Sequence, residues 1–225
     1  MSRSSDRDLG AVELASRRVQ YESAGLDITD VAADPLTQWQ RWYHDAAAAG
    51  VIEPNAMTVA TVGVDGTPDA RVVLARGVDE RSVVFYTNYQ SVKSRQLDAC
   101  PSAAAVFAWL DLHRQVRLRG PIERVSADES DRYFASRPRL SQIGAWASPQ
   151  SDVIVDRHQL DQLTEHYGER FEGRDVPRPD HWGGWRLVVE AAEFWQGRPS
   201  RLHDRIHYRA DPSAPEQWHI ERLAP

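Results

Sequence analysis

The chain has 225 residues, of which 33 are acidic and 27 are lysine or arginine, and its net charge at pH 7 is −6. This balance excludes nucleic acid as a general partner, because such binding needs surplus cations that displace counterions; a local basic cluster can still hold a small phosphate. The chain is long enough to bury a core without disulfides. Its single cysteine, Cys100, excludes an intrachain disulfide and a Cys-pair metal site.

The N-terminal sequence MSRSSDRDLG has no apolar signal-peptide core, and no apolar run approaches membrane-spanning length. With the lone cysteine, these features predict a protein of the reducing cytoplasm that does not enter a membrane. Residues 1–16 are polar and aperiodic, so we expect a flexible N-terminal arm. No linker divides the rest, and we expect residues 17–225 to form one domain.

The first helix is expected to begin at Asp34 and Pro35, because Asp caps a helix and Pro fits its first turn. Gly50 is expected to end it. One apolar face is predicted by the three-to-four spacing of Leu36, Trp39, Trp42, Tyr43 and Ala46.

Strands and short helices are expected along the rest of the chain. β-Branched and aromatic runs bounded by turns predict strands at 56–62, 71–76, 83–87, 103–110, 114–125, 185–190, 193–196, 205–209 and 218–223. Further helices are expected at 91–99, 126–136 and 155–171, the second with a capping box in which Ser126 pairs with Glu129. The small, polar segment 142–151 is expected to be a loop that packs closely on its surroundings.

Short strands joined by tight turns, with a few peripheral helices, are typical of an antiparallel β-barrel. Alternating β and α units of regular length are missing, which excludes a doubly wound sheet. The predicted fold class is therefore mainly β with peripheral helices.

The segment 182–205, WGGWRLVVEAAEFWQGRPSRLHDR, mixes tryptophan, glycine and arginine more closely than a buried core requires. Indole rings offer flat apolar surface, glycine permits close backbone approach, and arginine offers a planar fork for phosphate or carboxylate. Together they indicate a site for a flat, anionic ligand.

Two other segments carry groups suited to phosphate. Tyr86 and Thr87 end a strand just before a helix start that bears Ser91 and Lys93, an arrangement that fits a phosphate. In the segment YFASRPRLS, Arg137 lies between hydroxyls that can act as neutral donors. A helix that merely begins with Ser, or a solvated helix end, has a similar sequence.

The arginines Arg71 and Arg76 bracket an apolar run, and five residues apart on a strand they are expected to face opposite sides. Taken alone, this segment fits two surface arginines at strand ends at least as well. Further on, strand geometry would place Arg201, His203 and Arg205 on one face. No His or Cys spacing indicates a metal site, and GxSxG, Walker and GxGxxG motifs are missing.

An ordered series of motifs resembles the pyridoxamine/pyridoxine 5′-phosphate oxidase family from about residue 18 to residue 225. The series reads DPLT, NAMTVATV, RVVLAR, VFYTN, SRPRLSQIGAWAS, WGGWR, EFWQG, RLHDR and ERLAP. The resemblance implies a split β-barrel and a homodimer with FMN at the subunit interface, in agreement with the barrel expected from the strand pattern.

The resemblance also implies the site residues. Those that match the FMN site are Arg71, Val72, Val73, Leu74, Ala75, Arg76, Tyr86, Thr87, Lys93, Gln115, Gln150, Ser151, Trp195 and Arg205. Those that match the substrate site are Arg18, Tyr21, Arg76, Tyr133, Arg137, Ser141, Arg201 and His203. Arg201 and His203 correspond to the catalytic positions over the pyridine ring, and Arg18 and Tyr21 to an N-terminal element that closes over the substrate.

This chain departs from the family pattern at two positions. Arg76 stands where a lysine is usual, so a planar fork replaces a compact ammonium. Val92 stands where an arginine beside the FMN phosphate is common, so one cationic contact is lost and weaker FMN retention is expected.

The implied reaction is oxidation of pyridoxamine or pyridoxine 5′-phosphate to pyridoxal 5′-phosphate, with O2 as acceptor and hydrogen peroxide as product. Two alternatives remain open. One is a related flavin oxidase of the phenazine-forming type. The other is a non-catalytic protein that binds FMN or pyridoxal phosphate.

Overall fold

The computed structural model describes Tyr21 and residues 25–225. The predicted arm at 1–16 and Arg18 lie outside the described residues. Within the described residues, none of the helices combines the length and apolar character required to cross a bilayer.

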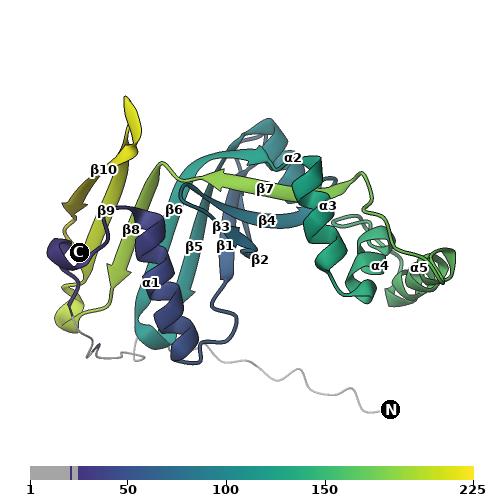
Figure 1. Ribbon diagram of the computed structural model, residues 1–225, viewed down its shortest axis with the longest axis horizontal. Helices are drawn as coiled ribbons and strands as arrows, with labels where there is room; N and C mark the ends of the chain where they lie inside the picture. Colours follow the sequence, from purple (N-terminus) through teal and green to yellow (C-terminus); the bar gives the residue numbers. More distant parts are fainter. Residues whose placement is uncertain (1–20, 22–24) are drawn as a thin grey trace, which may run out of the picture.

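Antiparallel strands form the body of the molecule, and the helices lie around it (Figure 1). The strands are β1 Ala56–Val62, β2 Pro68–Leu74, β3 Gly77–Val78, β4 Ser82–Asn88, β5 Ser102–Trp109, β6 Arg114–Arg124, β7 Trp182–Val188, β8 Ala191–Gln196, β9 Asp204–Asp211 and β10 Ala214–Arg222. The helices are α1 Pro35–Ala48, α2 Val92–Ala99, α3 Ala127–Ser136, α4 Arg139–Ala147 and α5 Arg157–Arg170, with 3-10 turns η1 Ile28–Asp30, η2 Leu110–Leu112 and η3 Pro199–Arg201.

The long strand β6 joins the two parts of a split barrel. The strands follow the order β10-β9-β8-β6-β5-β1-β2, and the end of β6 at Ile122–Arg124 turns away from β8 to pair with β7. β7 in turn pairs with β4 over its whole length, and β4 with the short β3. The predicted antiparallel barrel is confirmed.

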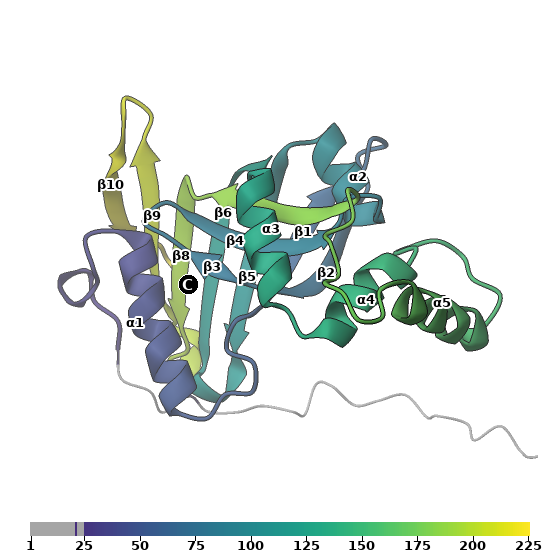
Figure 2. The same ribbon diagram turned by 45° about the vertical axis from the view of Figure 1, so that its right-hand side comes forward.

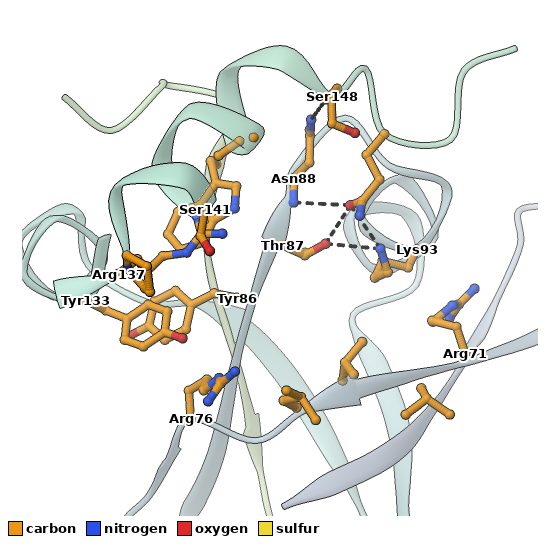
Figure 3. A pocket seen from close by; sticks show the side chains of 18 of the residues that line it. Arg71, Arg76, Tyr86, Thr87, Asn88, Lys93, Tyr133, Arg137, Ser141 and Ser148 are labelled. Carbon is orange, nitrogen blue, oxygen red and sulfur yellow. Dashed lines mark hydrogen bonds between the residues drawn. The ribbon is translucent and has the colours of Figure 1, made fainter. Parts of the chain in front are cut away.

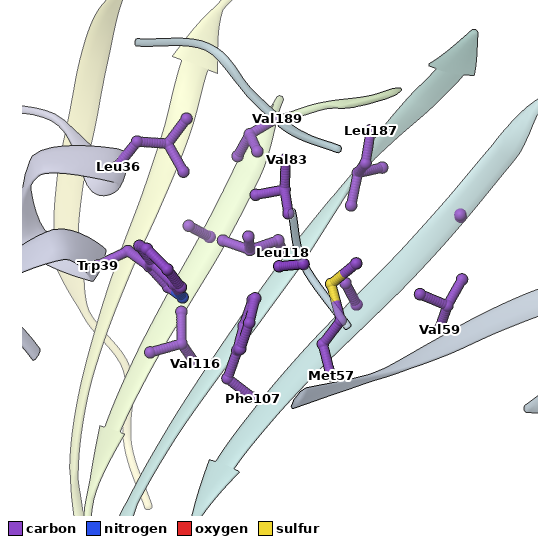
Figure 4. Packing of buried hydrophobic residues seen from close by; sticks show 14 of the residues in the cluster. Leu36, Trp39, Met57, Val59, Val83, Phe107, Val116, Leu118, Leu187 and Val189 are labelled. Carbon is purple, nitrogen blue, oxygen red and sulfur yellow. The ribbon is translucent and has the colours of Figure 1, made fainter. Parts of the chain in front are cut away.

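Alternating side chains of these strands fill the barrel interior, as the period of two along a strand requires. Phe107, Leu118 and Phe194 are completely buried there. Helix α1 covers one side of the barrel, where the Trp39 ring lies 5.1 Å from that of Phe107 (Figure 4). Trp42 meets Phe194 edge-on at 5.2 Å. The amphipathic face predicted for this helix is therefore its core-facing side.

A second, smaller apolar cluster joins the beginning of β7 to α3, α4 and α5. Helix α3 packs on β7, and α4 and α5 lie to one side of the barrel (Figure 2). Phe134, Ile143, Phe171 and Trp182 are its largest buried members. This cluster places the helices next to β4.

The helix caps predicted from sequence are confirmed. Asp34 accepts the N–H of Thr37 at 2.8 Å, Ser126 accepts that of Glu129 at 3.1 Å, and Gly50 follows α1 with a positive φ of 78°. The predicted loop at 142–151 is wrong for most of its length, because α4 extends to Ala147. Its alanines and glycine weaken the apolar periodicity from which a helix is recognised, although Ile143 and Ala147 are buried one turn apart.

Candidate functional site

A cavity of about 960 Å³ opens between β2, β4, α2 and the α3–α4 pair. Many of the residues expected in the FMN and substrate sites line it, namely Arg71, Val72, Val73, Leu74, Arg76, Tyr86, Thr87, Lys93, Tyr133, Arg137, Ser141 and Gln150. Two expected residues lie just outside its lining. Ala75 is buried in the barrel core, and the Ser151 hydroxyl accepts the N–H of Val92 at 3.2 Å.

One corner of the cavity is built around the ammonium of Lys93, a residue that is only 9% exposed (Figure 3). Its Nζ donates to the Thr87 hydroxyl at 3.0 Å, to Gln150 Oε1 at 3.2 Å and to the Ser91 hydroxyl at 3.3 Å. Among the described residues no carboxylate pairs with it. Burial, and then the nearby charge of Arg71, lower the pKa of Lys93 from 10.5 to about 8.

Arg71 and Arg76 both line this cavity, so the expectation that they face opposite sides is wrong. The reason is that β2 ends at Leu74, and Arg76 lies beyond it, with its N–H bonded to the Val84 carbonyl at 2.8 Å. The period of two therefore does not extend across the pair. Arg71 is itself held in place, with Nη2 at 2.6 Å from Asp69 and Nη1 at 2.6 Å from the Thr61 hydroxyl.

On the other side of the cavity lie Arg137, Tyr133 and Ser141, which come from the end of α3 and the beginning of α4 (Figure 3). Tyr86 of β4 stacks on Tyr133 with ring centroids 3.9 Å apart. Burial, and then the carboxylate of Glu129, raise the pKa of Tyr86 to about 12, so its hydroxyl stays protonated. Burial lowers the pKa of Arg137. The guanidinium remains charged at neutral pH, since arginine titrates far above it.

A second group of expected residues lies on the outer face of the sheet. Gln115, Trp195 and Arg205 are paired in register on β6, β8 and β9. Their neighbours in sequence, Val116, Phe194 and Ile206, point into the core. Arg205 donates to Glu193 at 2.9 Å and to the Ala224 carbonyl at 2.8 Å.

Arg201 and His203 do not share a strand face with Arg205, contrary to the expectation, because β9 begins only at Asp204. They belong to a turn in which Ser200 and Arg201 have positive φ values of 57° and 63°. His203 Nδ1 accepts the N–H of Arg198 at 3.1 Å, and the ring lies 4.6 Å from that of Trp195. Burial, and then the charge of Arg201, lower the pKa of His203 below its usual 6.5.

Tyr21 lies beside this turn. Its ring centroid is 4.3 Å from that of His113 and 5.7 Å from that of His203. The N-terminal segment is thus in contact with the second group at this one described position.

The two groups of expected residues do not meet within one chain. β1 and β5 separate β2 from β6, so Gln115 lies three strands from the cavity edge, roughly 15 Å at the usual spacing of strands. Gln115, Trp195, Arg201, His203 and Arg205 are not part of the cavity lining. A ligand that contacts both groups must therefore bridge two copies of the chain, or the chain must change shape.

Comparison with known proteins decides the family. A model described as pyridoxamine 5′-phosphate oxidase matches residues 43–195, and one described as the pyridoxine 5′-phosphate oxidase C-terminal dimerisation region matches residues 182–225. The chain belongs to the pyridoxamine 5′-phosphate oxidase family. The second match includes β8 and β9, which carry Trp195 and Arg205.

Curated members of this family are similar over almost their whole length. A pyridoxine/pyridoxamine 5′-phosphate oxidase of Burkholderia multivorans is 57% identical over 212 residues, which cover 94% of this chain and 99% of that protein. One of Cupriavidus necator is 53% identical over 213 residues, which cover 95% and 99%.

Solved structures of the family share the fold. PhzG of Burkholderia lata 383, in complex with tetrahydrophenazine-1-carboxylic acid, has a TM-score of 0.83 and 30% identity over 90% of this chain and 99% of its own. An FMN-binding protein of Nostoc punctiforme related to the oxidase has a TM-score of 0.66 and 17% identity over 83% and 97%. The second likeness concerns the fold alone.

Several cavity residues were not singled out from sequence. Asn88, Ser148 and Trp182 line the cavity, and the Asn88 amide bonds the Ser148 carbonyl at 3.4 Å. Asn88 and Ser148 end the VFYTN and SRPRLSQIGAWAS motifs, but the resemblance gave neither of them a role. Trp182 begins the segment noted for its composition, but nothing in that composition assigned it to the side of Arg137.

Proposed function

We propose that this chain is an FMN-dependent oxidase that converts pyridoxamine or pyridoxine 5′-phosphate to pyridoxal 5′-phosphate, with O2 as the electron acceptor. The observation that carries the proposal is one cavity with two cationic corners, at Lys93 with Arg71 and at Arg137. A cofactor and a substrate that each end in a phosphate need two such corners. The names of relatives at 57% and 53% identity support the same reaction.

The corner at Lys93 suits the FMN phosphate. A buried ammonium with only neutral partners is costly unless an anion neutralises it. The hydroxyls of Thr87 and Ser91 accept hydrogen bonds from the same Nζ, and Arg71 contributes a second cation to the cavity lining. Gln150 orients the ammonium from the other side.

We infer that the flavin ring lies between two copies of the chain in a homodimer. Gln115, Trp195 and Arg205 face outward on strands far from the phosphate corner, so a second copy must present them. The match of residues 182–225 to a dimerisation region supports this arrangement, because it includes two of these three residues.

The substrate phosphate would be held by Arg137 with the hydroxyls of Tyr133 and Ser141, and Arg76 lies close enough to lower the pKa of Arg137. Arg201 and His203 would act as the catalytic residues, with Arg201 nearest the reacting carbon and His203 orienting the ring substituents. Because Nδ1 of His203 accepts a hydrogen bond, the neutral ring carries its proton on Nε2, which becomes a donor. Tyr21 and Arg18 would close over the substrate.

When bound, FMN supplies the two-electron acceptor for oxidation at C4′ and passes the electrons to O2, which leaves as hydrogen peroxide. The chain's own residues bind, orient and shield the reactants. With the amine substrate, water completes the reaction and ammonia is released.

Two other functions would use the same cavity. The likeness to PhzG favours a phenazine-forming oxidase as the second candidate. A binding protein without turnover is the third, and the two departures at Arg76 and Val92 are its support.

The deciding experiment follows the flavin absorbance of FMN-loaded protein mixed anaerobically with pyridoxine 5′-phosphate, and separately with the amine. Bleaching, then recovery in air with pyridoxal 5′-phosphate formed, is the expected result. A flavin that stays oxidised with both substrates contradicts the proposal. Bleaching by a reduced phenazine precursor alone would favour the second candidate.

A further inference from the structure

Three aromatic rings stack at the Arg137 side of the cavity. Tyr86 of β4 is stacked on Tyr133 of α3 at 3.9 Å with 18° between the planes, and Trp182 of β7 is parallel to both, at 5.5 Å from Tyr86 and 6.1 Å from Tyr133. Trp182 is only 6% exposed. Three elements that are distant in sequence thus meet through these rings.

The glycines that follow Trp182 make this stack possible. Gly184 is opposite Tyr86 in the β4–β7 ladder, and a Cβ at Gly184 would lie 2.8 Å from the Tyr86 ring. A Cβ at Gly183 would lie 2.2 Å from the Tyr89 hydroxyl. A side chain at Gly184 would displace Tyr86 of the stack, and one at Gly183 would displace Tyr89, which follows β4.

Arg137 lies on the face of this indole. Its guanidinium carbon is 4.6 Å from the centroid of Trp182 and 5.5 Å from that of Phe134. Its Nη1 is buried without a hydrogen-bond partner in the described part of the chain, and no carboxylate there pairs with the side chain. A cation held by an aromatic face is positioned without being neutralised.

Other arginines near this region are held differently. Arg186 is paired with Glu129 at 2.9 Å, and Arg178 with Asp131 at 2.6 Å. Arg178 also donates to the Trp182 carbonyl at 2.7 Å, which fixes the backbone that carries the indole. The charge of Arg137 therefore remains available to a ligand, whereas Arg186 and Arg178 are paired with carboxylates of the protein.

We propose that Trp182 is a positioning residue that holds Arg137 and Tyr133 for the anionic end of the substrate, and that it thereby sets the preference for phosphorylated over unphosphorylated pyridine substrates. This inference rests on the proposed function. Trp182 itself needs no contact with the ligand, because it acts through Arg137.

The test measures the binding of 4-deoxypyridoxine 5′-phosphate, which has no oxidisable group at C4′, to FMN-loaded protein by calorimetry. The unphosphorylated 4-deoxypyridoxine is titrated in parallel. Trp182→Leu is expected to weaken binding of the phosphate ester about tenfold, the size of a desolvated cation–π contact, and to leave the unphosphorylated ligand unchanged. Trp182→Phe keeps a flat ring and is expected to lie between Trp182→Leu and the unsubstituted protein.

A double-mutant cycle separates positioning from general packing. If Trp182 acts through Arg137, Trp182→Leu has no further effect on phosphate-ester binding once Arg137→Gln is present. Trp146→Leu is the matched control, because Trp146 packs in the same cluster against Tyr167 and Phe171 and its Nε1 bonds the Pro177 carbonyl. This control should lose stability without changing the ratio of the two affinities.

Each outcome decides the inference. Additive losses in the cycle, or equal losses for both ligands, would overturn it and leave the proposed function intact, as shown by turnover of the unsubstituted enzyme. An unsubstituted enzyme that neither binds the ester nor turns over its substrate would overturn both. If Trp182→Leu does not fold, Trp182→Phe and Trp146→Phe make the same comparison.

Discussion

Gly197 and His113 are in direct backbone contact across the ends of β8 and β6: the Gly197 N–H donates to the His113 carbonyl at 2.7 Å. A Cβ at Gly197 would lie 2.8 Å from the Cβ of His113 and 3.0 Å from the Tyr21 ring. His113 itself has a left-handed backbone with φ of 51°. Because Gly197 has no side chain, the Tyr21 ring can lie here beside His203.

Gly197→Ala should therefore displace Tyr21 and destabilise the protein. Overpacking at such a contact costs about 1–3 kcal/mol in the free energy of unfolding. Under the proposed function, the KM for the phosphorylated substrate should also rise, because the segment at Tyr21 no longer closes. Chemical denaturation and steady-state kinetics measure the two effects.

Gly168→Ala in α5 is the control, since nothing lies within 4 Å of a Cβ built there. Alanine at an open helix position should stabilise the protein by roughly 0.5–1 kcal/mol. If both substitutions changed the free energy of unfolding and the KM alike, the contact with His113 and Tyr21 would have no influence on stability or substrate binding.

The pKa of Lys93 predicts how FMN binding depends on pH. Burial, with Arg71 second, lowers this pKa to about 8, so the ammonium loses its proton as the pH rises through 8. Only the charged form attracts phosphate. FMN affinity should therefore fall above pH 8, by up to about tenfold per pH unit until the pKa of Lys93 in the complex is reached.

The same lowered pKa affects the stability of the ligand-free protein. Between pH 8 and 10.5 the unfolded chain holds more protons on Lys93 than the folded chain, so the free energy of unfolding should rise with pH in this window. Lys93→Met should remove both dependences. Fluorescence titration of FMN and urea denaturation at several pH values test them, and unchanged slopes in the variant would assign the effects to other groups.

Local signals in the sequence predicted the boundaries of the fold well. Asp34 and Ser126 mark the helix starts through caps that need only residues three positions away. The β-branched and aromatic runs at β1 and β4 predicted strands from equally local information. Helix α4 was missed because Gly144, Ala145 and Ala147 carry little apolar periodicity, while its packing against α5 is not visible in the local sequence.

Most residues that the resemblance named line the candidate cavity or lie on the outer face of the sheet, but their geometry could not be predicted from the sequence. The resemblance named Lys93 and Gln150, yet these residues are 57 positions apart, and a local sequence pattern cannot predict the contact between them. The positive φ at Arg201 could not be predicted either, because no local sequence signal indicates a left-handed conformation at a non-glycine residue. Strand periodicity therefore placed Arg201 and His203 wrongly.

A substitution at Val92 tests whether FMN binds less tightly because this position has no arginine to contact the phosphate. It begins α2 next to Lys93, and its backbone N–H bonds the Ser151 hydroxyl at 3.2 Å. Val92→Arg should bind FMN about three- to tenfold more tightly, since an arginine beside a phosphate adds a charge-assisted hydrogen bond. The gain should shrink at high salt.

Val64→Arg adds the same charge at a residue that is 91% exposed, in the turn between β1 and β2. Its FMN affinity should match that of the unsubstituted protein. The same gain from both substitutions would mean that net charge, and not a contact at α2, limits FMN retention.

The separation of the two groups of site residues predicts complementation between inactive subunits. Lys93→Met removes a cation of the first group, and Arg201→Met alters an exposed turn residue of the second, so it should leave the fold intact. Each variant alone should be inactive under the proposed function. A mixed dimer contains one site in which both groups are intact, because each site takes one group from each subunit.

In the purified mixed dimer one of the two sites is intact, so its activity should be about half that of the unsubstituted dimer. The two variants are co-expressed with different affinity tags, and the mixed dimer is purified through both. As a control, a double variant that carries both substitutions on one chain is paired with an unsubstituted chain. The double variant contributes one altered group to each of the two sites, so this mixed dimer should be inactive. No recovery with Lys93→Met and Arg201→Met, together with activity in that control, would place both groups in the site of a single chain.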